Sequence, residues 1–123
     1  METLDDFSTR LSKSVGCYNH KCRSDRYSLK KYNSNERLKM GVFAWIEERK
    51  RTKSFEISTY KKYGDQCGVT DNADKIVPGM HYISKKKDDG EGTGIVFYVK
   101  NGSADADFDK TVKALKAILS LLY

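Results

Sequence analysis

The chain has 123 residues, the length of one domain, and it can bury a hydrophobic core without disulfide or metal staples. Hydrophobic residues make up 38% and charged residues 33%, and no apolar run approaches the roughly 18 to 20 residues that a membrane span requires. The formal net charge of +6 favours polyanions as partners, and nucleic acids are the commonest of these. We therefore expect one domain and no membrane partner.

The N-terminus predicts an intracellular protein, cytoplasmic or nuclear. The segment from Met1 to Phe7 is acidic and lacks the cationic segment and apolar block of a secretory signal. The cysteines, Cys17, Cys22 and Cys67, are odd in number, so free thiols are the expectation for a chain that is not secreted. A local disulfide between Cys17 and Cys22 on oxidation stays open.

The same cysteines raise the question of zinc. Cys17 and Cys22 flank His20, and Cys67 and His81 lie further along the chain, so soft ligands are available in principle. Zinc sites usually show two closely spaced pairs, and here only one pair exists. We therefore expect reduced thiols, no metal and no cofactor.

Residues 3–15 have the pattern of an amphipathic helix. Thr3 can cap its start, and Asp6 follows three residues later, as in a capping box. One stripe of this helix is apolar and consists of Leu4, Phe7, Leu11 and Val15.

The segment 16–35 is basic and aromatic, with almost no aliphatic residues and no sustained period. About twenty such residues inside a compact domain are typical of a functional or disordered loop. The sequence therefore predicts a long basic and aromatic loop over 16–35, which is the first place to look for binding.

A second helix is predicted from Ser34 or Asn35 to about Arg51. Gly41 inside it costs about 1 kcal/mol relative to alanine, which suggests a close crossing with another element. Cations gather at the C-terminal end, where the helix dipole favours them. The apolar face of this helix would carry Leu38, Val42, Trp45 and Ile46.

Residues 54–62 alternate in polarity and predict a strand whose Phe55 and Ile57 face the core. A loop rich in Asp, Asn and Gly follows over 64–78. This strand is expected to belong to the same sheet as the hairpin that comes next.

The strongest pattern is a hairpin, with strands over 81–85 and 95–99 joined by a glycine-rich turn over 88–94. A C-terminal helix follows, because apolar residues return at the spacing of one helical face. They are Phe108, Val112, Leu115, Leu119 and Leu122.

These elements predict the α+β class, with a three-stranded antiparallel sheet and about three helices packed mainly on one face. Residues 1–123 are expected to form a single domain. From residue 35 onward, the order helix, strand, strand, strand, helix is similar in outline to double-stranded-RNA-binding domains and to the Alu-RNA-binding proteins of the signal recognition particle. The segment 102–110 is acidic where the first family is basic, so no RNA contact is transferred and no family is assigned.

Candidate binding residues come from three basic segments. The first interleaves tyrosines with lysine and arginine, which combines charge that neutralises phosphates with rings that stack on bases. The second closes the expected second helix, and the third precedes the hairpin turn. The candidate nucleic-acid-binding residues are Tyr18, Lys21, Arg23, Arg26, Tyr27, Lys30, Lys31, Tyr32, Arg49, Lys50, Arg51, Lys53, Lys85, Lys86 and Lys87.

No catalytic constellation is recognisable, because the chain has two histidines, no nucleophile elbow and no pair of acids in a distinctive setting. We therefore predict a small non-enzymatic protein that binds nucleic acid, RNA ahead of DNA, and has no catalytic residues. The alternative is a protein interaction module or inhibitor that binds an acidic protein partner, or that dimerises through an exposed strand edge. The sequence leaves the oligomeric state open.

Overall fold

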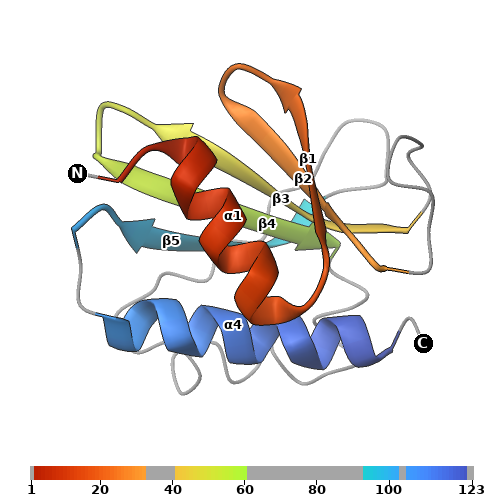
Figure 1. Cartoon of the computed structure of the whole chain (residues 1–123). Coiled ribbons are helices and arrows are strands. Elements are labelled where there is room, and N and C mark those ends of the chain that lie inside the picture. Colours follow the sequence, from red (N-terminus) through yellow and green to blue (C-terminus); the bar gives the residue numbers. More distant parts are fainter. Residues whose placement is uncertain (1, 33–40, 61–92, 103–104, 122–123) are drawn as a thin grey trace.

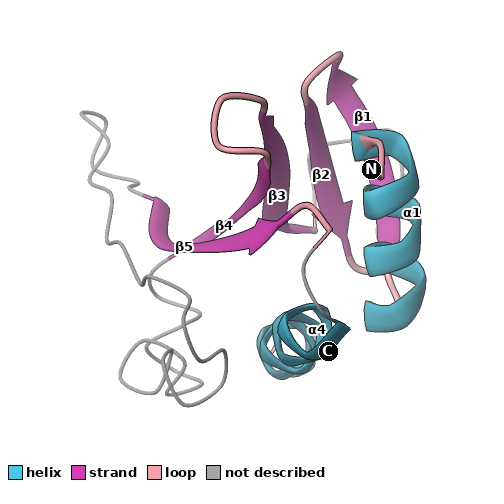
Figure 2. Cartoon of the chain, turned by 90° about the vertical axis from the view of Figure 1, so that its left-hand side faces the viewer, coloured by secondary structure: helices cyan, strands magenta, loops and turns pink. Residues whose placement is uncertain are grey.

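Figure 1 gives the computed structural model, which describes residues 2–32, 41–60, 93–102 and 105–121. Five antiparallel strands form one sheet in the order β1-β2-β3-β4-β5, so each strand pairs with the next one along the chain. Figure 2 shows the two helices on one face of this curved sheet. The elements are α1 (Leu4–Val15), β1 (Tyr18–Arg23), β2 (Arg26–Lys30), β3 (Val42–Arg49), β4 (Ser54–Tyr60), β5 (Thr93–Lys100) and α4 (Asp105–Ser120).

The N-terminal helix is confirmed. The Thr3 hydroxyl accepts a hydrogen bond from the Asp6 backbone N–H at 3.1 Å, which caps α1, and Gly16 ends the helix in the left-handed region with φ 86°. The predicted apolar stripe is buried, and it points at the sheet. These residues are Leu4, Phe7, Leu11 and Val15.

The prediction of a long loop over 16–35 is wrong, because residues 18–30 form the hairpin of β1 and β2. Tyr27 and Leu29 are buried against α1, and a two-residue turn, Ser24 and Asp25, joins the strands. The strand β1 lies at the edge of the sheet and needs few aliphatic residues, so the usual apolar signal of a strand is weak there. The last three residues of the expected loop, 33–35, lie outside the described residues.

The predicted second helix is also wrong where it can be compared, since residues 42–49 form β3. This strand pairs with β2 on one side and β4 on the other, so it is the centre of the sheet. Gly41 has φ 81° and leads the chain into the strand, in place of the helix crossing that was expected. Residues 34–40 of the expected helix lie outside the described residues.

The predicted strand over 54–62 is confirmed over 54–60, with Phe55 and Ile57 buried in the core, and its last two residues lie outside the described residues. The expected strand over 95–99 is part of β5, which pairs with β4 and also includes Thr93 and Gly94, two residues predicted for the turn. The other strand of the expected hairpin, 81–85, and the expected loop over 64–78 lie outside the described residues.

The C-terminal helix is confirmed as α4, and it meets α1 over β4. The ring of Phe7 stacks on Phe55, with centroids 4.1 Å apart, and meets Phe108 edge to face at 6.1 Å. Leu115 and Ile118 are fully buried on the same side. One apolar core therefore lies between the helices and one face of the sheet.

The predicted architecture is wrong in its parts, although the α+β class holds. The described residues contain five strands and two helices, where three strands and about three helices were expected. Because β3 replaces the second helix, the described residues lack the element order on which the outline likeness to RNA-binding domains depended. Among the described residues, neither helix is long and apolar enough to cross a membrane.

Candidate functional site

Two hairpin turns lie side by side at one end of the sheet. The β1–β2 turn contacts the end of β3 through a hydrogen bond from the Glu48 N–H to the Asp25 carbonyl at 3.3 Å. The β3–β4 turn contacts the end of β5 through a hydrogen bond from the Asn101 N–H to the Lys53 carbonyl at 2.8 Å. We call this end, formed by residues 23–26, 47–56 and 98–101, the turn end.

A row of polar side chains crosses the sheet here, on the face away from the helices. The register aligns Arg26 with Glu47, Glu47 with Glu56, and Glu56 with Tyr98. Side chains alternate between faces along a strand, and at least one described neighbour of each of these residues is buried in the core: Tyr27, Ile46, Phe55 and Val99. Glu56 is 5% exposed, so a carboxylate is buried on a face that has no described helix over it.

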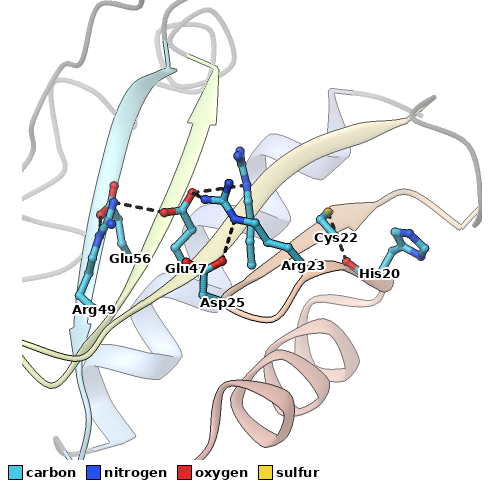
Figure 3. A network of polar contacts seen from close by, with 8 residues as sticks. His20, Cys22, Arg23, Asp25, Glu47, Arg49 and Glu56 are labelled. Atoms are coloured by element: carbon cyan, nitrogen blue, oxygen red, sulfur yellow. Dashed lines mark hydrogen bonds and ion pairs between the residues drawn. The ribbon is translucent and has the colours of Figure 1, made fainter.

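Three arginines surround the two carboxylates, as Figure 3 shows for Arg23 and Arg49. Glu47 lies 3.3 Å from Arg49 Nη2, 3.4 Å from Arg26 Nε and 3.6 Å from Arg23 Nη2. Glu56 accepts a hydrogen bond from Arg49 Nε. Like charges directly opposite on neighbouring strands repel, so the arginines offset a repulsion that the register itself creates.

Arg49 joins the two carboxylates and so holds β3 to β4 through side chains as well as backbone. The hydrogen bond to Glu56 raises the pKa of the Arg49 guanidinium above its ordinary value, and the charges of Glu56 and Glu47 add to this effect. Arg26 Nε is buried and lacks hydrogen-bond geometry toward Glu47, so that contact is electrostatic. Arg23 also pairs with Asp25, in the adjoining turn, at 2.7 Å.

The positive charge of the turn end comes from the β3–β4 turn. The charges of the three arginines are matched by three acids, Glu47, Glu56 and Asp25. By contrast, Lys50, Arg51 and Lys53 are exposed and form no ion pair within the described ranges. Lys100, at the end of β5, is exposed beside them because it aligns with Ser54.

A shallow, open hollow of about 1020 Å³ lies between the two turns. The β1–β2 turn contributes residues 23–25 and the β3–β4 turn contributes residues 48–52, while Glu56 and Tyr98 form the floor. The first two predicted basic segments therefore meet at one place, although they are far apart in sequence. The third segment, Lys85, Lys86 and Lys87, lies outside the described residues.

Other candidate residues of the first segment lie away from the turn end. Tyr18 and Tyr32 pack edge to face at 4.8 Å, where β1 begins and β2 has ended, and Lys31 lies beside them in the chain. Lys30 is 2% exposed. These residues cannot contact the same short ligand as the turn end, because they lie at the opposite end of the hairpin.

Tyr27 and Lys21 are tied to the first helix. The Tyr27 hydroxyl donates a hydrogen bond to Asp5 at 2.6 Å, and Lys21 lies 3.3 Å from the same carboxylate. These contacts lower the pKa of Asp5, chiefly through the Tyr27 hydrogen bond. Desolvation is the main cause that raises the pKa of Tyr27 to about 12, so this ring is part of the packing of α1 on β2.

The two cysteines that the structure describes differ in their exposure to solvent. Cys17 is buried, and desolvation raises the pKa of its thiol to about 12. Cys22 is exposed, with Sγ 3.6 Å from the His20 carbonyl oxygen. Within the described ranges no three His, Cys, Asp or Glu side chains are grouped to hold a metal ion, and Cys67 and His81 lie outside those ranges.

Sequence reasoning missed several members of this site, among them Glu47, Glu56, Tyr98 and Lys100. Glu47 was assigned to a helix end and Glu56 to the strand face opposite the core. Tyr98 belonged to the predicted strand over 95–99, and Lys100 lay just after that strand with no assigned role. Only the strand register brings these residues beside the basic turn. The one available signal was the placing of Glu56 opposite the core face in the alternating pattern of β4.

Comparisons with models of protein families, with curated proteins and with solved structures found no match for this chain. The fold and the site define it at the level of a class: an α+β domain with an apolar, helix-covered sheet face and a charged opposite face.

Proposed function

We propose that this is a small non-enzymatic nucleic-acid-binding protein that favours RNA over DNA and makes contact through its turn end. The observation that supports the proposal is the meeting of two basic hairpin turns, which places Arg23 beside Arg49, Lys50 and Arg51 around one hollow. A basic surface of this kind raises the local concentration of polyanions and binds their phosphates.

The two kinds of cation have different parts in this proposal. Lys50, Arg51 and Lys53 are exposed, so they can neutralise phosphates, release the counterions bound there and supply salt-dependent affinity. Arg23 and Arg49 are held by acids and add little net charge, but their guanidinium groups are already oriented. In both arginines Nε and Nη2 face the acids, so the Nη1 side is the part offered to a phosphate oxygen. Because that group is already oriented, it binds with less loss of side-chain entropy than a free lysine does.

The state of the carboxylates favours binding over catalysis. Glu47 and Glu56 are neighbours, which is the arrangement that a hydrolytic metal site would need. Each is engaged by at least one arginine, so neither carries free charge for a metal ion or a proton transfer. RNA is placed ahead of DNA because proteins recognise RNA mainly at unpaired loops and ends, which fit an open hollow.

Titration of labelled, mixed-sequence RNA and DNA at two salt concentrations tests the proposal. The turn variant K50Q/R51Q/K53N removes three charges from the β3–β4 turn. Asparagine is chosen at Lys53 because that residue has φ 52°, a conformation that asparagine tolerates. We expect wild-type binding to weaken steeply with salt and the turn variant to bind at least about tenfold more weakly at low salt.

The matched control is K13Q/K113Q/K116Q, which removes the same charge from exposed positions on α1 and α4. It should retain most of the affinity, because those lysines lie on the helices and away from the turns. Absence of binding to either polymer at low salt would end the proposal. Co-purification of an acidic protein that survives nuclease treatment and is lost in the turn variant would favour the alternative, a protein interaction module.

A further inference from the structure

The ring of Tyr98 lies on the floor of the hollow. Tyr98 aligns with Glu56 in the register of β5 and β4, and its neighbour Val99 is buried in the core, so Tyr98 points away from the helices. It is half-buried, and it lines the hollow together with Glu56 and the two turns. A planar ring therefore faces the space that the basic turns enclose.

Other rings on this face are engaged by protein groups. Trp45 meets Tyr60 edge to face at 5.1 Å, and the Arg26 guanidinium lies 5.4 Å from the Trp45 ring centroid. Tyr98 has no ring partner in the part of the chain that the structure describes. It is thus the aromatic surface that a ligand in the hollow would meet.

Cations from both turns line the same hollow as this ring. Arg23 comes from the β1–β2 turn, and Arg49, Lys50 and Arg51 come from the β3–β4 turn. The Glu56 carboxylate, beside Tyr98 on the neighbouring strand, is neutralised by its hydrogen bond from Arg49. One aromatic ring between two sets of cations is the combination by which proteins hold a single strand, with the base on the ring and its phosphates on the cations.

Resting on the proposed function, we propose that the hollow takes one unpaired base of a single strand, stacked on Tyr98 with its flanking phosphates held by the two turns. Bases within a duplex present only their edges in the grooves, so their faces cannot reach a ring on the floor of a hollow. The ligand class is therefore single-stranded nucleic acid, and a duplex binds only through its phosphates.

The experiment compares one mixed sequence as a single strand and as a duplex, with wild type, Tyr98→Leu and Tyr98→Phe. Since stacking on one aromatic side chain changes affinity by about tenfold or more, wild type should prefer the single strand by at least that factor. Tyr98→Leu should lose this preference and keep the duplex affinity. Tyr98→Phe should keep it, because stacking needs the ring and not the hydroxyl.

A measurement on wild type alone keeps the test independent of how the variants fold. A single strand carrying one 2-aminopurine should change its fluorescence on binding, because the base exchanges its neighbours in the strand for the Tyr98 ring, and the same base within a duplex should not change. Equal affinity for single strand and duplex, or equal losses for both in Tyr98→Leu, would overturn the inference and leave nucleic-acid binding standing. No binding to either form at low salt would instead remove the proposed function.

Discussion

The strand β4 has two faces that are buried in different ways. Toward the helices it presents Phe55 and Ile57, which are covered by aromatic and aliphatic side chains. On the other face it presents Glu56, which is also buried but is held by a hydrogen bond from Arg49 Nε. The apolar face of β4 therefore stabilises the fold, whereas its charged face forms part of a surface.

The two kinds of burial respond differently to substitution. Apolar burial is non-directional, so its loss depends on the volume removed and on how far neighbours can collapse. A buried carboxylate depends on one partner of fixed geometry, and removing that partner leaves a charge without compensation. Substitutions on the two faces of β4 should therefore differ in the size of the stability loss, in whether a second substitution restores stability, and in how the loss depends on pH.

The largest effect is expected on the apolar face. Phe55→Ala removes the ring that stacks on Phe7, in the centre of the core. Substitutions of this kind cost about 3 to 5 kcal/mol, which is a large share of the stability of a small domain. Urea denaturation should show that loss, with little difference between pH 5 and pH 8. A loss below about 1 kcal/mol would mean that this stack is not part of the core.

Arg49→Ala should have the next largest effect. It leaves Glu47 and Glu56 facing each other, with the side chain of Glu56 only 6% exposed. We expect a loss of about 1 to 3 kcal/mol, less than for a fully buried pair because the Arg49 side chain is 42% exposed. The matched control, Arg23→Ala, breaks the exposed pair with Asp25 and a 3.6 Å contact with Glu47, which keeps Arg26 and Arg49, so it should cost less than about 1 kcal/mol.

The stability lost in Arg49→Ala should be restored in part by a second substitution on the same charged face. In the Arg49→Ala background, Glu56→Gln should restore part of the stability, because an amide in place of the carboxylate removes the uncompensated charge. The same Glu56→Gln change alone should destabilise the protein. A double variant as unstable as the sum of the two single variants would contradict a direct coupling between these side chains.

Tyr27→Phe tests the contact between α1 and β2 and should have a smaller effect than Arg49→Ala. The folded state holds the Tyr27 proton more tightly than the unfolded chain, with a pKa raised from 10.0 to about 12. Its contribution to stability is therefore complete below pH 10.0 and is lost as pH rises through about 12. Alkaline denaturation should show a steeper decline in wild type than in Tyr27→Phe. Parallel curves would contradict the raised pKa.

The smallest effect is expected for Glu47→Gln, and it concerns affinity. Removing this carboxylate releases charge on Arg23, Arg26 and Arg49, so nucleic-acid affinity at low salt should rise by about two- to fivefold. Glu48→Gln removes a charge from the same hollow without releasing an arginine and should give a smaller gain. A fall in affinity for Glu47→Gln would mean that orientation of the arginines outweighs their charge.

The same contrast explains which elements could be predicted from the sequence. The helices have one buried face and one exposed polar face, and β4 alternates apolar with polar side chains although both of its faces are buried, so the periods of 3.6 and 2 could be recognised in the sequence. In β3, the run from Phe43 to Ile46 lacks alternation because residues on both faces are covered, and the spacing of Val42, Trp45 and Ile46 also fits a helix. The β-branched and aromatic character of that run was the signal that favours a strand.

The candidate site could be predicted only in part for a related reason. Basic residues on two turns were recognised as candidates, because clustered charge is visible along the chain. Their meeting at one end of the sheet depends on β2 pairing with β3, which no local pattern encodes. The arginine–glutamate contacts depend on the same register, because a shift by one residue would place Glu47 and Glu56 on the core face.

The most direct test of the account is the salt dependence of RNA binding in the turn variant K50Q/R51Q/K53N and in its control K13Q/K113Q/K116Q. If the β3–β4 turn contacts three phosphates of a single strand, the slope of log affinity against log salt should become shallower by about 2 in the turn variant and stay unchanged in the control. Equal changes of slope in both variants would contradict a contact surface at the turn end and would indicate diffuse attraction by the whole basic protein.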